Sequence, residues 1–192
     1  MLETRQPQYD LAGHLPGQMP LSPPGVACND GRDPHHPPTV PYYSLWTGQD
    51  GLSSLAACAL TAFSARSVGG KAAPMWMRLF KGDVEAIFFS VLPVGWVGEW
   101  HESPKPQWVV PLSGRWFIET QDGSRVEMGP GEIHWGQDIG TRAIGGNHGH
   151  RSGQLGELPC VHLMIQFKVP SGSTALACPF DDPKSDKSEA TT

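Results

Sequence analysis

Titratable residues that alternate along predicted strands are the first candidates for chemistry in this sequence. Glu99 and His101 are two residues apart, and side chains at that spacing on a strand point to the same face. His148 and His150 have the same spacing, which is common among metal ligands but fits surface histidines in a Gly-rich loop equally well. Neutral imidazole binds Zn, Fe, Ni or Cu, and it also transfers protons near neutral pH. These residues therefore indicate either a metal site or acid–base catalysis.

Two other histidines lie on predicted strands. His162 alternates with apolar residues and is expected to face the interior, as a metal ligand or a general base. His134 lies between Ile133 and Trp135, and a structural histidine is the simpler interpretation for it.

Three residues are candidates for substrate binding. Arg151 is suited to hold a carboxylate or phosphate, although an exposed loop arginine explains it as well. Trp108 and Trp135 are expected either to fill the core or to form the wall of an apolar ligand cavity. Strand alternation predicts that Gln107 and Val109 face one way while Trp108 faces the other.

Short strands must position these residues. The 23 Gly and 19 Pro disfavour long helices and favour strands joined by tight turns. Turn signals such as Asp122-Gly123 are typical of antiparallel hairpins, so the pattern predicts a sandwich or a barrel. The predicted strands are 42–46, 57–63, 75–80, 84–92, 96–101, 107–112, 115–120, 125–128, 132–135 and 160–169.

Length and composition predict one domain with a terminal extension at each end. Residues 42–169 contain the strand signals, residues 1–41 form a Pro/Gly-rich arm, and residues 170–192 form a flexible tail. The net charge of −5 and the lack of a Lys/Arg cluster argue against a nucleic-acid partner. Neither a bilayer-spanning apolar run nor a secretory signal is visible, so we expect a cytoplasmic protein with no membrane partner.

The four cysteines do not show a metal-binding or redox pattern. Cys28, Cys58, Cys160 and Cys178 form no C-x-x-C pair and no zinc spacing. Cys160 lies in an apolar strand pattern, which predicts a reduced core residue. A disulfide among the other three stays open.

The stretch from residue 95 to residue 167 resembles the cupin superfamily, whose fold is a double-sheet jelly roll. The first cupin motif has a Gly, a pair of histidines, a Glu a few residues later and a closing Gly, and it matches residues 95–114 here. The matching positions are His101 for the first histidine, Ser103 for the second, Gln107 for the glutamate and Gly114 for the closing glycine. Ser and Gln therefore replace two of the four usual metal ligands.

The second cupin motif begins at Gly131-Glu-Ile-His-Trp, and its histidine would be His150, with His148 as the rival. The resemblance implies an all-β, cupin-type double-stranded β-helix, or jelly-roll barrel, with an extended N-terminal arm. It implies a divalent metal ion (Fe, Zn, Ni or Mn) held by His101, Gln107 and His150, and it implies a homodimer.

Three functions are consistent with these features. The first is a metal-dependent enzyme acting on a small organic metabolite, with the metal as Lewis acid or O2-binding centre, of isomerase, lyase or dioxygenase type. The second is a metal-free isomerase, cyclase or lyase, in which His101, Glu99 or His162 moves a proton and Gln107 donates a hydrogen bond to a developing oxyanion. The third is a non-catalytic small-molecule binding protein. We expect the first by a narrow margin, because His101 and His150 both match motif positions.

Overall fold

The computed structural model describes residues 31–33, 35–80, 82–168 and 176–181. These residues form eleven β-strands and no helix, so they contain no helix that could span a membrane. The predicted all-β class is confirmed. The strands are β1 (Val40–Thr47), β2 (Ser53–Leu60), β3 (Ser64–Arg66), β4 (Met75–Met77), β5 (Val84–Leu92), β6 (Gln107–Ser113), β7 (Arg115–Thr120), β8 (Arg125–Met128), β9 (Ile133–Gln137), β10 (His150–Leu155) and β11 (Cys160–Phe167).

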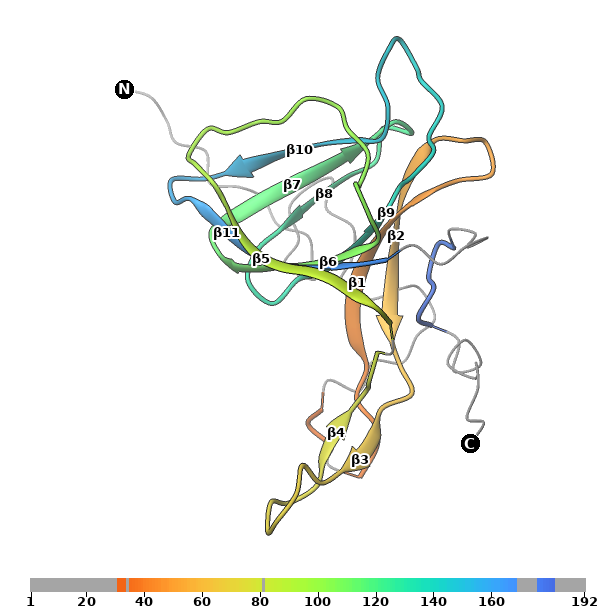
Figure 1. Cartoon of the computed structure of the whole chain (residues 1–192). Helices are drawn as coiled ribbons and strands as arrows, with labels where there is room; N and C mark the ends of the chain where they lie inside the picture. The colour runs from red at the N-terminus through yellow and green to blue at the C-terminus, as the bar shows by residue number, and fades with distance from the viewer. Residues whose placement is uncertain (1–30, 34, 81, 169–175, 182–192) are drawn as a thin grey trace.

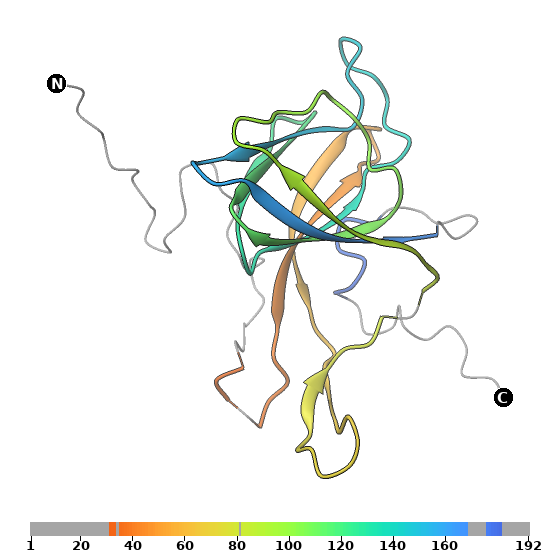
Figure 2. The same cartoon turned by 60° about the vertical axis from the view of Figure 1, so that its left-hand side comes forward.

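Two of the three sheets face each other and form the body of the fold (Figure 1). The larger sheet is mixed and has the strand order β2-β1-β9-β6-β11-β5, with β1 and β9 as its parallel pair. The smaller sheet is antiparallel, in the order β10-β7-β8. Strands β3 and β4 form a separate ribbon that projects from the body in both views (Figure 2). The sheets do not close into one barrel within the described residues, so the jelly-roll barrel stays a prediction.

A buried apolar core lies between the two facing sheets. Because side chains alternate along a strand, each sheet turns every second residue toward the other. The larger sheet contributes Tyr43, Leu45, Val109 and Cys160, and the smaller sheet contributes Trp116, Ile118, Val126 and Met128. Cys160 is a free, buried cysteine, as predicted.

Three strands, β5, β7 and β8, have the predicted bounds, but residues 96–101 do not form the predicted strand. This segment pairs with β10 at two isolated points, Val97 with Gly153 and His101 with His150. Four residue steps separate Val97 from His101, whereas three separate Gly153 from His150. This unequal count is the register of a β-bulge. The carbonyl of Glu99 accepts a hydrogen bond from Nδ1 of His101 at 2.8 Å instead of joining the ladder.

Strand β10 lies in a stretch that the sequence analysis interpreted as a Gly-rich loop. Its Gly153 obscured the strand pattern, because glycine is unusual inside strands. A Cβ atom at Gly153 would overlap the ring of Phe117 on the neighbouring strand β7. This glycine therefore marks a close approach between strands rather than a loop.

The outer face of the larger sheet carries a second apolar cluster, which the C-terminal segment covers. The ring of Phe180 lies 5.1 Å from that of Trp108 and 4.9 Å from that of Trp135. A disulfide joins Cys58 on β2 to Cys178. Residues 176–181 thus lie within the predicted flexible tail but are packed and cross-linked, whereas Cys28 and most of the predicted arm and tail lie outside the described residues.

Strand β5 leaves part of this outer face exposed. Every second side chain of β5 points to this face, namely Ile87, Phe89 and Val91, and Phe89 is 68% exposed. A homodimer could cover this exposed surface, and the homodimer stays a prediction.

Candidate functional site

A cavity of about 150 Å³ lies between the two facing sheets and brings most of the candidate residues together. Both sheets and the loop between β5 and β6 contribute to its wall. The lining residues are Ser90, Leu92, Trp96, His101, Gln107, Val109, Trp116, His134, His150, Ser152, His162 and Met164. His101, Gln107 and His150, which the cupin motifs combine, therefore share one cavity.

Strand alternation explains which residues reach this cavity. Gln107 and Val109 on β6 line it, as their spacing predicted, and so do His162 and Met164 on β11. On β9 the same alternation turns His134 inward.

The three residues predicted to bind substrate do not line the cavity. Trp108 and Trp135 belong to the cluster on the outer face, where they pack against Phe180. Arg151 is offset by one residue from His150 on β10 and donates from Nη2 to Oε2 of Glu119 at 2.8 Å. The alternation that turns Gln107, His134 and His150 inward turns these neighbours outward.

Glu99 was predicted to share a face with His101, but it is exposed and does not line the cavity. The bulge in residues 97–101 removes the simple alternation on which that prediction relied. The backbone carbonyl of Glu99, rather than its carboxylate, contacts the His101 ring.

His101 and His150 form the central pair of the site. Their backbones exchange two hydrogen bonds, of 2.9 and 2.8 Å, and their ring centroids lie 4.4 Å apart. Nδ1 of His101 contacts the carbonyl of Glu99, and Nδ1 of His150 contacts Oδ2 of Asp138 at 2.7 Å. Both partners are acceptors, so they assign the proton of each ring to Nδ1. Nε2 of each ring is then left with a free lone pair.

The rival histidine lies elsewhere. His148 is exposed in the loop between β9 and β10, where its Nδ1 contacts the carbonyl of Thr141 at 2.9 Å. His150, not His148, therefore reaches the cavity.

Asp138 is a functional candidate that the sequence analysis missed. Its side chain is fully buried behind His150, and Oδ1 accepts a hydrogen bond from the backbone N–H of Ser103 at 2.9 Å. Burial raises the pKa of Asp138, but the interactions with His150 and Ser103 outweigh it and lower the pKa below its usual value. Asp138 is thus a carboxylate at neutral pH. The available signal was that it is the only acidic residue between β9 and β10.

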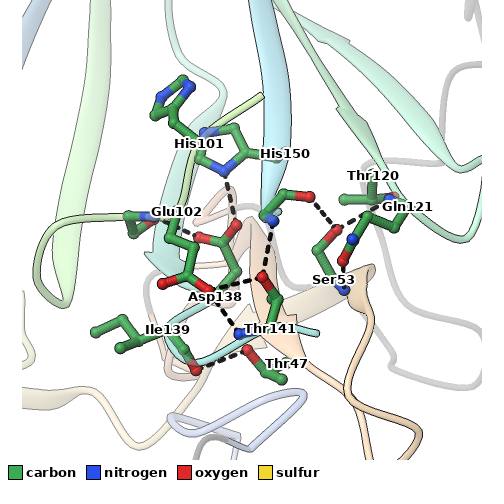
Figure 3. A network of polar contacts seen from close by, with 12 residues as sticks. Thr47, Ser53, His101, Glu102, Thr120, Gln121, Asp138, Ile139, Thr141 and His150 are labelled. Atoms are coloured by element: carbon green, nitrogen blue, oxygen red, sulfur yellow. Dashed lines mark hydrogen bonds and ion pairs between the residues drawn. The ribbon is translucent and has the colours of Figure 1, made fainter. Parts of the chain in front are cut away.

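A polar network fixes the loop that carries Asp138 (Figure 3). Oε1 of Glu102 accepts hydrogen bonds from both the backbone N–H and the hydroxyl of Thr141, at 2.6 and 2.7 Å. The hydroxyl of Thr141 accepts from the N–H of Gly149 at 2.8 Å, and Ser53 donates to the carbonyl of Gly149 at 2.6 Å. The network thereby anchors both ends of the loop beside the His101–His150 pair.

Gly149 sets the spacing of this pair, and we expect Gly149→Ala to disturb it. Its φ is +67°, and an added Cβ atom would overlap the carbonyl of His101. Gly140 is a matched control in the same loop, because its φ is +75° and an added Cβ would meet nothing. Gly140→Ala should lower the free energy of unfolding by about 1–2 kcal/mol, the usual cost of a left-handed alanine, and Gly149→Ala should lower it by about 3 kcal/mol or more. Urea unfolding of both variants measures this, and equal losses would contradict it.

Two further histidines line the cavity in the neutral form. Burial lowers the pKa of His134 to about 3, assisted by the nearby His150, and burial lowers the pKa of His162 to about 4. The ring nitrogens of His162 already contact Oγ of Ser90 at 3.4 Å and Sγ of Cys160 at 3.2 Å. Burial also raises the pKa of Cys160 to about 11, so this pair is a neutral thiol and imidazole rather than a thiolate nucleophile. His162 is therefore less available for proton transfer than His150.

The buried neutral histidines predict acid sensitivity. A histidine with a pKa near 6.5 when unfolded and about 4 when folded binds more protons in the unfolded state, so stability falls as the pH drops from about 6.5 toward 4. Between pH 7 and pH 4.5, we expect the wild type to lose about 2–3 kcal/mol more unfolding free energy than His162→Gln loses. Urea unfolding at both pH values measures the change, with His148→Gln as the exposed-histidine control. Parallel pH profiles for wild type and His162→Gln would contradict the prediction.

The predicted metal ligands fit an ion in part. Nε2 of His101 and Nε2 of His150 are available, but Oε1 of Gln107 accepts a hydrogen bond from Nε2 of Gln166 at 2.9 Å. The ligand atom expected from Gln107 is thus engaged within the protein. Among the described residues, the only close group of three His, Cys, Asp or Glu ligand atoms is Cys58, Cys178 and Asp181, and its two sulfurs form the disulfide.

Comparisons of this chain with protein-family models and with curated proteins find no match. The geometry of the cavity therefore carries the functional argument, and the cupin resemblance stays an expectation.

Proposed function

We propose that the protein is an acid–base enzyme that moves a proton on a small organic molecule bound between the two sheets. One observation carries this proposal: the hydrogen bond of 2.7 Å between Nδ1 of His150 and the buried carboxylate of Asp138, in a cavity-lining histidine. A carboxylate in this position holds the imidazole in one tautomer and stabilises the imidazolium that forms when Nε2 takes a proton. His150 is therefore the general base.

Gln107 supplies the complementary hydrogen-bond donor. Its Oε1 is engaged by Gln166, and its Nε2 has no hydrogen-bond partner among the described residues. An amide N–H that is fixed in a cavity wall stabilises negative charge as it develops on an oxygen. This is the role expected for Gln107 in the metal-free alternative, and the contact with Gln166 favours it over metal ligation.

The proton transfer needs no further reactant. His150 takes a proton from a carbon next to a carbonyl group, the C–H electron pair becomes a C=C bond, and the carbonyl π pair moves onto oxygen. Gln107 donates a hydrogen bond to that oxygen. Return of the proton to a different atom gives an isomer. If the proton on His150 is first replaced by one from water, return to the same carbon gives hydrogen exchange with solvent. His101 is exposed at the cavity and adjacent to His150, so it can pass protons to and from water.

A second candidate, a metal-dependent enzyme, is favoured by the two free Nε2 atoms. A carboxylate behind a histidine also orients metal ligands, so His101 and His150 would hold the ion. The metal would supply Lewis-acid polarisation of a carbonyl oxygen.

Deuterium exchange together with metal analysis separates the candidates. Small carbonyl compounds are incubated with the untagged protein in D2O and followed by proton NMR, and bound metals are measured by mass spectrometry. The acid–base proposal expects exchange that survives a chelator and falls about 10²–10⁴-fold in His150→Gln, with His148→Gln as the matched control. Metal near one equivalent, lost in His101→Ala and His150→Ala, with exchange abolished by the chelator, would establish the second candidate instead. Ligand binding without exchange or metal would indicate a binding protein.

A further inference from the structure

We infer that the ligand of this cavity is an uncharged hydroxy-carbonyl compound of about six to eight non-hydrogen atoms. The choice of a carbonyl group rests on the proposed function, whereas size and charge rest on the cavity wall alone. Each of these properties comes from a separate feature of the lining residues.

The volume sets the size. A cavity of about 150 Å³ holds a molecule of roughly the size of benzene. Two further atoms fit because the site reaches solvent beside the exposed His101. Larger metabolites, such as sugars with phosphate or nucleotide groups, would have to extend out of this space into solvent.

The charges of the lining residues disfavour an anion. The cavity is lined by apolar, hydroxyl, amide and imidazole side chains, with no Lys or Arg among the described residues that line it. The carboxylate of Asp138 lies directly behind His150, which lines the cavity. A carboxylate or phosphate on the ligand would lie unpaired in this space and close to a second negative charge, which is strongly unfavourable.

The same wall is poorly suited to a cation. Both oxygens of Asp138 are occupied, one by His150 and one by the N–H of Ser103. An ammonium group has three N–H donors, and the free acceptors of the central pair are Nε2 of His101 and Nε2 of His150. Because Nε2 of His150 takes the C–H proton in the proposed function, Nε2 of His101 and the amide donor of Gln107 are left to match one hydroxyl group and one carbonyl oxygen.

The test compares binding of three probes that differ in charge. Dihydroxyacetone is neutral, pyruvate has the same number of non-hydrogen atoms and is anionic, and aminoacetone is cationic. NMR titration of the full-length protein at pH 7 should show dihydroxyacetone binding at least about 10-fold more tightly than either charged probe. Equal or tighter binding of a charged probe, or no binding of dihydroxyacetone, would overturn the inference.

A pair of variants places the discrimination in the cavity. Met164 lines the cavity, and Leu163, the residue before it, lies on the opposite face of β11. Met164→Lys should improve pyruvate binding relative to dihydroxyacetone by about 10-fold or more, and the control Leu163→Lys should leave the ratio unchanged. An equal change in both variants would mean that general surface charge, not the cavity, selects the ligand.

Failure of the inference and failure of the proposed function give different results. If dihydroxyacetone binds selectively but its C–H groups do not exchange with D2O, the inference on ligand class holds and the proton-transfer function is wrong. If pyruvate exchanges faster than dihydroxyacetone and loses that exchange in His150→Gln, the function holds and the inference is wrong.

Discussion

Asp138→Asn should lower the rate of proton transfer by about 10²–10⁴-fold while ligand affinity changes by less than about threefold. The reason is the tautomer of His150. The carboxylate accepts the proton of Nδ1 at 2.7 Å and leaves Nε2 free to act as a base. An asparagine amide can donate to Nδ1 instead, which moves the ring proton to Nε2 and blocks it, and it cannot balance the charge of an imidazolium.

The measurement is deuterium exchange into the bound carbonyl compound, together with nitrogen NMR of the His150 ring. The NMR should show the proton moving from Nδ1 to Nε2 in Asp138→Asn. Glu119→Gln is the matched control, because Glu119 is a carboxylate that pairs with Arg151 and does not line the cavity. A switched tautomer with an unchanged exchange rate would remove His150 from the role of base.

The same variant distinguishes the metal candidate. If His150 were a metal ligand, Asp138 would orient it, and loss of such a partner typically weakens metal binding by about 10–100-fold. Activity would then recover when excess metal is added. In the acid–base proposal, added metal does not restore exchange, because the defect lies in the ring tautomer.

Sequence patterns predicted those features of the fold that depend on neighbouring residues. The bounds of β5, β7 and β8 follow from strand signals ended by turns, and strand alternation predicted that Gln107 and Trp108 would face opposite ways. Sequence patterns failed where a contact with a residue far away in the sequence determines the local structure. Gly153 is compatible with β10 only because it lies against Phe117, and no local pattern contains that contact.

The residues of the candidate site also divide into those that local sequence patterns predicted and those that depend on distant contacts. His101, Gln107 and His150 were combined from motif spacing, and the cavity contains all three. Asp138 could not be paired with His150 from sequence, because the loop between them folds back through Thr141 and Gly149. Trp108 and Trp135, which were expected either to fill the core or to form a cavity wall, pack in the cluster on the outer face. Phe180, which covers these two rings, is far from them in the sequence. The Cys58–Cys178 disulfide holds its segment there, and the sequence alone did not predict that pairing.

Removing the Cys58–Cys178 disulfide should lower the free energy of unfolding by about 2–5 kcal/mol. The bond joins residues 120 positions apart, so it restricts the unfolded chain over most of the folded domain. In the native state it also holds the segment that places Phe180 against Trp108 and Trp135. Urea unfolding of the double variant Cys58→Ser/Cys178→Ser measures the loss, and tryptophan fluorescence reports whether Phe180 leaves the cluster.

A reductant provides the control for this prediction. It should destabilise the wild type to the level of the double variant and leave the double variant unchanged, because the double variant lacks the Cys58–Cys178 bond that the reductant breaks. Wild-type stability that does not respond to complete reduction would contradict the entropic argument. The result also bears on where the chain works, since reducing compartments keep such pairs as thiols. A cytoplasmic protein, as expected from the sequence, would have to fold without this contribution, and the packing of Phe180 alone would then have to cover the outer face of the larger sheet.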